Sequence, residues 1–523
     1  MLDAASAVTA LLIRRCRRQR HMRPPVFLCV LLLSLTCSAM LPKALFASPR
    51  WLKLESAHFQ LLASAGENDG RSLILHLEQA RSFFVTSMGS ASIPASPVCI
   101  IGFNSETEFD SLRPSEWSAG FHVGAPNRDY IVLKDASSEY YPVAIHEYVH
   151  VLMKQAGQRA PLWWQEGLAE VYSTLRILGG TAEVGAVNAR RSRVLKKQPL
   201  LDLAVLMGVD RSSPIYGDPN KAEVFYAESW ALAHMLYFEE PYRPRFENFL
   251  NCLPAAAGPE ELFADAYGKT LVQVQEDFDD YLRKGEFKSL FLPVQLEHSQ
   301  GDIKVTPATD LELAVAFAYL SLGVNKGNHA RLSLERLSLA YPDSWEVEES
   351  LGYVCWLAEN REEARYHLGR AVEKGMTNAR TYLNYAGLLG ETHVANSVLI
   401  GLAERALQLQ PENRQASLKL ASLYLRDRQY SRVVEHISRL EDVRPEEAFQ
   451  VSCTLAYAYL GMEDLESARK SMEEAMLLAS TSAETAEAER LFQSLLARQQ
   501  NSIPLRPATV PPKDMLPWII PAV

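Results

Sequence analysis

The stretch AIHEYVHVL, residues 144–152, contains two histidines four residues apart and a glutamate directly after the first. Residues four apart lie on the same face of an α-helix, so the imidazoles of His146 and His150 could bind one metal ion. Glu147 lies roughly 100° further round the helix, where its carboxylate could reach a water molecule on that metal. The pattern predicts a zinc site with an adjacent general base, and two surface histidines on an amphipathic helix are the simpler alternative.

A second segment, APLWWQEGLAEVYS at residues 160–173, offers the carboxylate that such a site requires. Glu166 and Glu170 are one helical turn apart. Gly157 and Pro161, which precede them, are expected to end the first helix and so allow the second helix to fold back on it. Two histidines and one carboxylate make a three-ligand set that leaves a fourth position for water. The two segments together therefore predict one Zn²⁺ per chain.

The pair HEYVH and WWQEGLAE resembles the gluzincin metallopeptidases, specifically the peptidase MA-like group, over about residues 50–290. This resemblance implies that Glu166 is the third zinc ligand and that Glu170 hydrogen-bonds a zinc-bound histidine. The spacing departs from that of thermolysin-like members, because only 15 residues separate His150 from Glu166, and Glu170, after 19, would fit the longer spacing. The G-x-M-E-N motif of the related aminopeptidases is not evident, which favours an endopeptidase.

The mechanism that this ligand set implies needs a base and a second electrophile. Bound zinc lowers the pKa of its water to about 7, and Glu147 is expected to take the proton and pass it to the leaving amine. The developing oxyanion needs a further donor, for which Tyr216, Tyr226 and His234 are candidates. The segment Y-A-x-S-W resembles the corresponding helix of the family, which implies this role for Tyr226, and a packed core tyrosine is the alternative.

Strand signals precede helix signals in residues 48–290, which indicates an α+β fold. The resemblance implies a zincin-like catalytic domain with a small sheet, active-site helices and a helical lobe. The strand pair around Phe121–Val123 and Tyr130–Leu133 is expected to hold a peptide by strand addition, and Gly120 and Gly124 would allow its backbone to come close. Strands are predicted at 58–64, 97–103 and 129–135, no strands after Tyr140, and helices at 142–156, 163–178, 221–239, 244–252 and 259–285.

The rest of the chain repeats with a period of 34 or 35 residues, as the small residues Ala318, Gly352, Gly387, Ala421 and Ala456 show. Small side chains at fixed offsets let paired helices approach closely, and the pattern resembles the tetratricopeptide repeat. It predicts an all-α solenoid that docks a protein partner. The predicted parts are a linker at 291–310, five repeats at 311–480, a capping helix at 481–500 and a Pro-rich tail at 501–523.

Residues 1–47 indicate a signal peptide or an N-terminal anchor. Arginines precede the apolar segment VFLCVLLLSLT, 26–36, which is too short to span a bilayer comfortably. Translation could begin at Met1 or Met22, and cleavage could follow Ala39 or Ala47. We therefore expect an exported protein, periplasmic or extracellular, that meets a membrane only where this segment stays uncleaved.

The composition further limits the classes of protein and of partner that fit this chain. The 523 residues suffice for several domains, and 48% hydrophobic and 22% charged residues are typical of a globular protein. The net charge of −10 argues against a nucleic-acid partner. Cys99, Cys252, Cys355 and Cys453 contain no C-x-x-C pair, so they predict neither a cysteine zinc site nor a redox motif, and their disulfide status stays open.

Three functions fit these observations. The first is an exported zinc endopeptidase with a repeat domain for protein docking. The second is a repeat-built binding or assembly protein whose peptidase domain is slow or vestigial, and the third is another zinc hydrolase acting on a small amide or a peptide terminus. The intact ligand set favours the first. Since all the chemistry precedes residue 290, a truncation ending near Ser289 is expected to fold, bind zinc and cleave a short peptide.

Overall fold

The computed structural model describes residues 51–499, and the predicted signal or anchor and the Pro-rich tail lie outside this range. Within it the description leaves out residues 65, 89–96, 115–117, 126, 156–159, 254–255, 297–299, 324–326, 441–442, 444 and 480–481.

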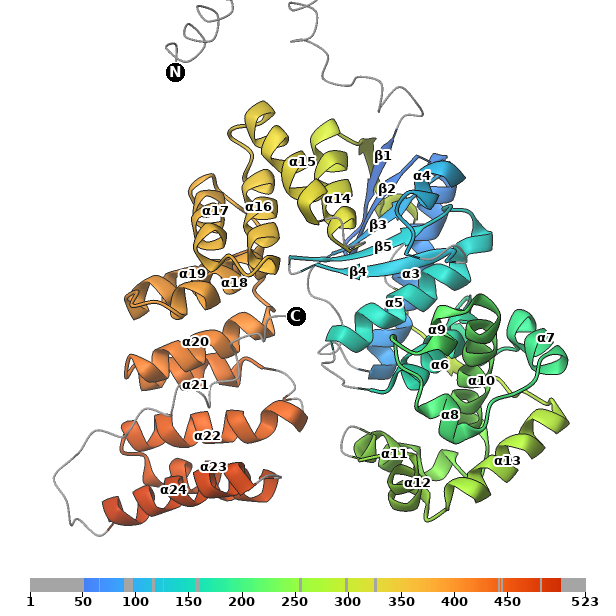
Figure 1. Cartoon of the computed structure of the whole chain (residues 1–523). Helices are drawn as coiled ribbons and strands as arrows, with labels where there is room; N and C mark the ends of the chain where they lie inside the picture. Colours follow the sequence, from blue (N-terminus) through green and yellow to red (C-terminus); the bar gives the residue numbers. More distant parts are fainter. Residues whose placement is uncertain are drawn as a thin grey trace, which may run out of the picture. The chain divides into compact units, whose positions relative to one another are not determined.

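A six-stranded mixed sheet opens the described chain (Figure 1). The parallel strands β2, β3 and β5 correspond to the three predicted strands, and antiparallel neighbours flank them. Strand β4 forms one edge of the sheet and pairs with β5. In spatial order the strands are β4 (Gly120–Gly124), β5 (Asp129–Leu133), β3 (Val98–Gly102), β2 (Phe59–Ala63), β1 (Leu52–Glu55) and β9 (Lys304–Pro307).

Helices surround this sheet and continue into a helical lobe. The helix predicted at 259–285 is two helices, because Gly268 ends the first with a φ of 69° and Thr270 caps the second with Gln273. The α-helices are α3 (Glu67–Met88), α4 (Glu106–Asp110), α5 (Tyr141–Gln155), α6 (Leu162–Ser173), α7 (Ala189–Lys197), α8 (Leu203–Met207), α9 (Pro214–Gly217), α10 (Pro219–Phe238), α11 (Phe246–Cys252), α12 (Pro259–Tyr267) and α13 (Leu271–Lys284). Short 3₁₀ turns are η3 (Ser138–Tyr140), η4 (Arg243–Arg245) and η5 (Gln300–Asp302).

Two predictions about the middle of the chain are wrong. Strands do follow Tyr140, since β6 (Arg176–Leu178), β7 (Thr181–Val184) and β8 (Leu290–Pro293) form a second antiparallel sheet. The helix predicted at 163–178 therefore stops at Ser173. The segment predicted as a linker contains β9 and all but the first residue of β8, so both sheets need residues from it to complete their pairing.

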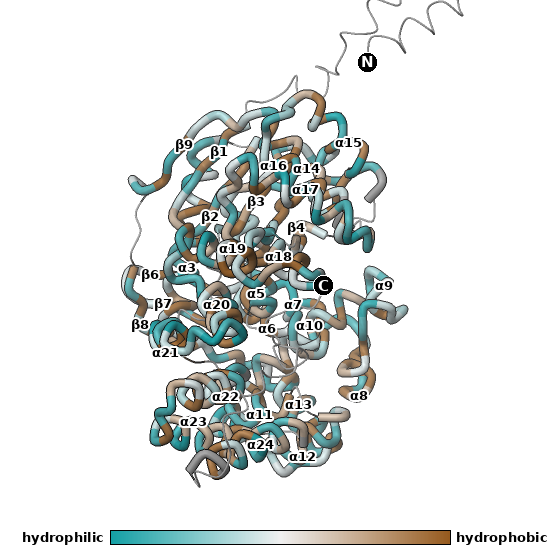
Figure 2. Tube along the Cα trace, turned by 90° about the vertical axis from the view of Figure 1, so that its left-hand side faces the viewer, coloured by the Kyte–Doolittle hydropathy of each residue, from teal (hydrophilic) through white to brown (hydrophobic). Residues whose placement is uncertain are grey.

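Paired helices occupy the last part of the described residues, with α24 after the fifth pair, at the predicted cap. In Figure 2 hydrophobic and hydrophilic residues alternate along their tubes, as expected for helices with one buried face. The pairs are α14 (Asp310–Gly323) with α15 (Gly327–Ala340), α16 (Trp345–Leu357) with α17 (Arg361–Glu373), α18 (Ala379–Gly390) with α19 (Asn396–Leu409), α20 (Arg414–Arg426) with α21 (Tyr430–Ser438), α22 (Pro445–Gly461) with α23 (Leu465–Leu478), followed by α24 (Ser482–Gln499).

The sheet is buried on both faces, and the repeats cover one of them. Side chains alternate along a strand, so Ile100 of β3 belongs to the core shared with α3 and α5, whereas Ile101 belongs to a core shared with α14 and α16. Tyr130 of β5 stacks on Tyr319 of α14 on this second face, with ring centroids 5.6 Å apart. All described residues group into one compact unit. The expectation that a truncation near Ser289 folds must therefore be revised.

Two features of the described residues concern membrane-spanning helices and cysteines. None of the helices in the described residues combines the length and the apolarity needed to cross a bilayer. Cys99, Cys252, Cys355 and Cys453 are free thiols, and all but Cys252 are buried. Buried cysteines of this kind act as small apolar core residues.

Candidate metal centre

Helices α5 and α6 build the centre by packing on each other. Ile145, Tyr148 and Leu152 of α5 are buried in the main core, which fixes the opposite face of that helix toward α6. Helix α10 crosses α6 closely: a Cβ on Gly167 would lie 2.3 Å from the carbonyl oxygen of Ser229. The glycine that follows Glu166 in the sequence motif therefore has a packing reason, since any side chain would push α10 away.

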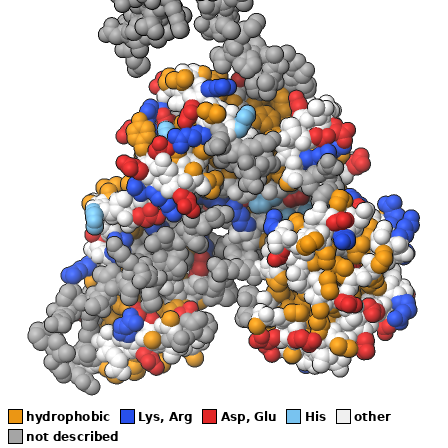
Figure 3. Space-filling view, in the orientation of Figure 1, with side chains coloured by type: hydrophobic (Ala, Val, Ile, Leu, Met, Phe, Trp, Pro, Cys, Tyr) orange, Lys and Arg blue, Asp and Glu red, His pale blue; other side chains and the backbone are white. Residues whose placement is uncertain are grey.

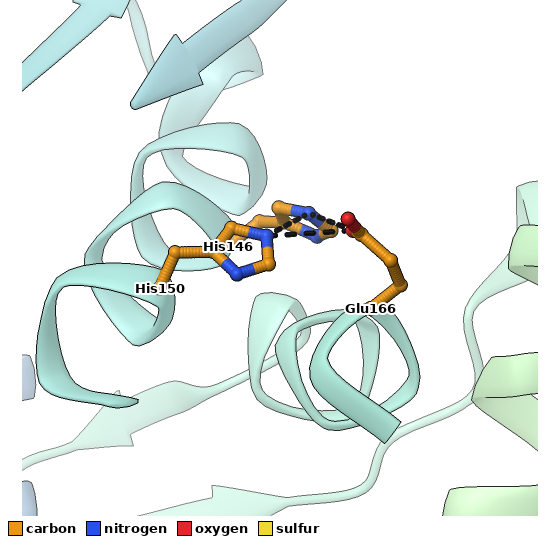
Figure 4. A group of neighbouring side chains, drawn as sticks. All are labelled: His146, His150 and Glu166. Carbon is orange, nitrogen blue, oxygen red and sulfur yellow. Dashed lines mark hydrogen bonds and ion pairs between the residues drawn. The ribbon is translucent and has the colours of Figure 1, made fainter. Parts of the chain in front are cut away.

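The structure brings His146, His150 and Glu166 together (Figure 4). The two Nε2 atoms are 3.2 Å apart, and Glu166 Oε2 lies 3.2 Å from that of His146 and 3.4 Å from that of His150. A tetrahedral zinc site with bonds of about 2.0–2.1 Å has ligand atoms about 3.3–3.4 Å apart. The three donor atoms therefore have the mutual spacing of three corners of such a site.

The charges around these atoms also suit a cation. Within the described chain, Glu166 Oε2 is buried and has no hydrogen bond of good geometry. Burial disfavours a charge on His146, but the adjacent carboxylate of Glu166 and the negative charges of Glu170 and Glu147 raise its pKa to about 9. Burial likewise opposes the charge on Glu166, but the two histidines hold its pKa well below the ordinary value. The residues fit a zinc ion, which would take the place of the proton held here.

Glu170 lies beside the ring of His146, on the side away from the three donor atoms, where the resemblance implied a carboxylate. Its Oε1 lies 3.5 Å from His146 Nδ1, the ring nitrogen that faces away from the other donors. Asn188 Nδ2 donates to its Oε2 at 2.9 Å, and Arg191 Nη2 donates to its Oε1. A carboxylate fixed in this way orients the imidazole and selects which nitrogen is free to bind a metal.

Sequence reasoning missed Asn188 and Arg191, which hold Glu170 from helix α7. Asn188 also caps α7, because its Oδ1 accepts from the backbone N–H of Arg191 at 3.1 Å. Figure 3 shows basic side chains at the margin of the helical lobe where α7 lies, but the side chain of Arg191 is only 11% exposed. The one available signal was an asparagine before a basic helix, which predicts a cap and not a contact 21 residues away.

A cleft with a volume of about 990 Å³ contains the centre. Glu147 lines it and is 8% exposed, which fits the role of a base next to the donor atoms. Strand β4 lines it with Gly120, Phe121, His122 and Val123. The cleft thus places the metal ligands, one further carboxylate and the edge strand β4 around one space.

Two of the three candidate electrophiles lie in this cleft. Tyr216 and Tyr226 both line it, and their hydroxyl oxygens are 3.2 Å apart. The ring of Tyr226 lies 6.4 Å from that of His146, and burial raises the pKa of Tyr226 well above its usual value, so its hydroxyl stays protonated and can donate. His234 is fully buried elsewhere, between the carbonyl oxygen of Gly185 and the hydroxyl of Tyr281. His234 has a structural role.

The glycines of β4 were expected to make room for a peptide backbone, but in the structure they make room for helix α5. A Cβ on Gly120 would lie 2.6 Å from Val143 Cγ1, and a Cβ on Gly124 would lie 2.3 Å from Lys154 Nζ. Both contacts are with α5. The close approach that these glycines permit is therefore that of the histidine helix to the sheet edge.

We expect Glu166→Ala and Glu170→Ala to differ in their effect on zinc. Glu166 contributes a donor atom, so its loss should remove most of the metal, whereas Glu170 acts through His146 and its loss should weaken zinc binding by about 10–100-fold. Competition with a chromophoric chelator measures both affinities. A larger loss from Glu170→Ala would exchange the two assignments.

No family model and no curated protein matches the chain. Similar solved structures include YrrB, a TPR protein with an unusual peptide-binding site, at 16% identity over 34% of this chain and 90% of its own, with a TM-score of 0.31. They also include pilF of Pseudomonas aeruginosa (18% identity, 37% and 92% coverage, TM-score 0.27) and the type IV pilus biogenesis factor PilW (14%, 37% and 94%, 0.28). The repeat architecture of this chain rests on its own register and helix pairs.

Proposed function

We propose that this chain is an exported, zinc-dependent hydrolase of peptide bonds, an endopeptidase whose repeat domain docks a protein. The convergence of His146, His150 and Glu166 on one point carries the proposal, because three donor atoms 3.2–3.4 Å apart lie in a cleft that also contains Glu147. That set of residues provides the parts of metal-assisted hydrolysis and leaves space for a substrate.

Glu147, Tyr226 and Tyr216 would each have a separate role in the hydrolysis of a peptide bond. Zinc, when bound, supplies Lewis acidity and lowers the pKa of a water molecule to about 7. The carboxylate of Glu147 accepts the proton of the attacking water and passes it to the leaving nitrogen. The protonated hydroxyl of Tyr226 donates to the developing oxyanion, with Tyr216 fixing its direction by the hydroxyl contact.

The edge strand β4 supports an extended peptide as the substrate class. Its far side has no partner strand in the six-stranded sheet, and it borders the cleft. A peptide backbone can pair with such an edge, and its side chains then alternate between the cleft and the outside. A small amide would leave most of the 990 Å³ cleft empty.

A second candidate is a binding or assembly protein whose function resides in the repeats. The favouring observation is that helices from α17 to α24 form a second hydrophobic core, distinct from the core of the sheet and the active-site helices. These repeats extend beyond what the sheet needs as a cover, and stacked helix pairs provide a surface for protein docking.

One experiment separates the two candidates. Purified protein of residues 48–523 is expected to carry about one zinc per chain, to cleave peptides from a mixed library, and to stop when a chelator removes the metal and resume when zinc is returned. Elemental analysis and mass spectrometry of the peptides provide the readouts. Stoichiometric zinc without cleavage would favour the second candidate, and protein without zinc would overturn the metal site.

A further inference from the structure

Asp129, the first residue of β5, meets nitrogen donors from the side chains of three separate elements. Its Oδ1 lies 2.9 Å from His122 Nε2 and accepts from Lys154 Nζ at 3.1 Å. Its Oδ2 accepts from Arg380 Nη1 at 3.5 Å. The Asp129 side chain is only 3% exposed, so the arrangement is a buried junction.

Two of these partners border the cleft. His122 lies on the edge strand β4, and Lys154 follows His150 by one turn of α5. The Lys154 ammonium passes directly over Gly124, where a Cβ would meet it at 2.3 Å. Asp129 therefore ties the strand that flanks the cleft to the helix that carries both histidines.

The third partner belongs to the repeats. Arg380 lies in the first turn of α18, and the turn before Asp129 is anchored to earlier repeat helices. Asn127 Nδ2 donates to Tyr319 Oη and to Glu349 Oε2, each at 2.9 Å. A short chain of buried polar contacts thus links the repeats to the cleft, beside the apolar core that α14 and α16 share with the sheet.

The electrostatics make this junction sensitive to the loss of a partner. Burial opposes a charge on Asp129, but the hydrogen bond to His122 and the charges of Lys154 and Arg380 lower its pKa well below the ordinary value. When Arg380 is removed, the buried carboxylate loses one of the partners that compensate its charge. The partners that remain are His122 and Lys154, and both border the cleft.

We propose that Asp129 is a positioning residue through which the third helix pair of the repeats sets the spacing between strand β4 and helix α5. The consequence for peptide binding rests on the proposed function, but the mechanical link does not. The repeats then act on the affinity of the cleft for its substrate and leave the chemistry at the donor atoms unchanged.

The test uses the full chain with Arg380→Ala. Hydrogen–deuterium exchange is expected to become about tenfold faster in residues 120–124 and in the last turn of α5. KM for a cleaved peptide is expected to rise about tenfold while kcat and zinc content stay within about twofold. Arg380→Lys restores a cation and should recover most of both effects.

The matched control is Arg414→Ala, which breaks the pair that Arg414 makes with Glu447 inside the later repeats. It should leave exchange in β4 and α5 unchanged. Asp129→Asn keeps the size of the side chain and should reproduce the effect of Arg380→Ala even where that variant is poorly folded. Unchanged exchange in both Asp129→Asn and Arg380→Ala, or an equal change in Arg414→Ala, would overturn the proposal. If the protein cleaves no peptide, the proposed function fails, and the exchange data still decide on the junction.

Discussion

Replacement of Glu147 by glutamine is expected to reduce peptide hydrolysis by about 10²–10⁴-fold while the protein keeps its zinc. The amide has the size of the carboxylate but cannot accept the proton of the attacking water. None of the three converging donor atoms belongs to Glu147, so metal binding should survive. Initial rates and elemental analysis of the same preparation measure both quantities.

Another glutamate provides the control for Glu147. Glu139 borders the same cleft from the turn before α5 and is exposed. Glu139→Gln makes the same chemical change away from the donor atoms and should alter hydrolysis by less than about twofold. A Glu147→Gln protein with full activity would remove the general-base role. One that loses zinc together with activity would place Glu147 among the ligands.

The histidine pair could be predicted from the sequence because the geometry of a single helix fixes it. Residues four apart share a face whatever the rest of the chain does. The geometry of one helix could not decide whether Glu166 or Glu170 is the third zinc ligand. The two glutamates are one turn apart on α6, and both lie near His146. One lies at its Nε2 and the other at its Nδ1, and only the packing of two helices decides which nitrogen each carboxylate meets.

The large sheet, too, could be predicted from the sequence only in part. Strands β3 and β5 were predicted from their apolar runs, and in the structure they have buried residues at every position, which is typical of strands covered on both faces. What covers the second face was not readable, because α14 and α16 lie far along the chain. Strand β9 escaped prediction because its four residues form a strand only by pairing with β1.

Deletion of everything after Ser289 is expected to prevent cooperative folding. It removes the third strand of the small sheet, strand β9, and the helices that cover one face of the large sheet. Leu62, Ile101 and Val132 would become exposed, and each buried aliphatic side chain contributes about 1.5–3 kcal/mol. Their sum approaches the about 5–15 kcal/mol by which whole domains are stable. Near-ultraviolet circular dichroism during heating should show no transition, and the protein should retain no zinc.

A longer truncation, ending at Gln410, is the informative comparison. It keeps α14 to α19, and with them the cover of the sheet and the Arg380–Asp129 contact, and it removes only the later repeats. Stacked repeats interact mainly with their neighbours, so the loss of terminal units is tolerated better than the loss of the sheet cover. This protein should melt cooperatively and bind zinc. If the chain ending at Ser289 did the same, the first repeats would be separable from the sheet, and the shared core would contribute little to its stability.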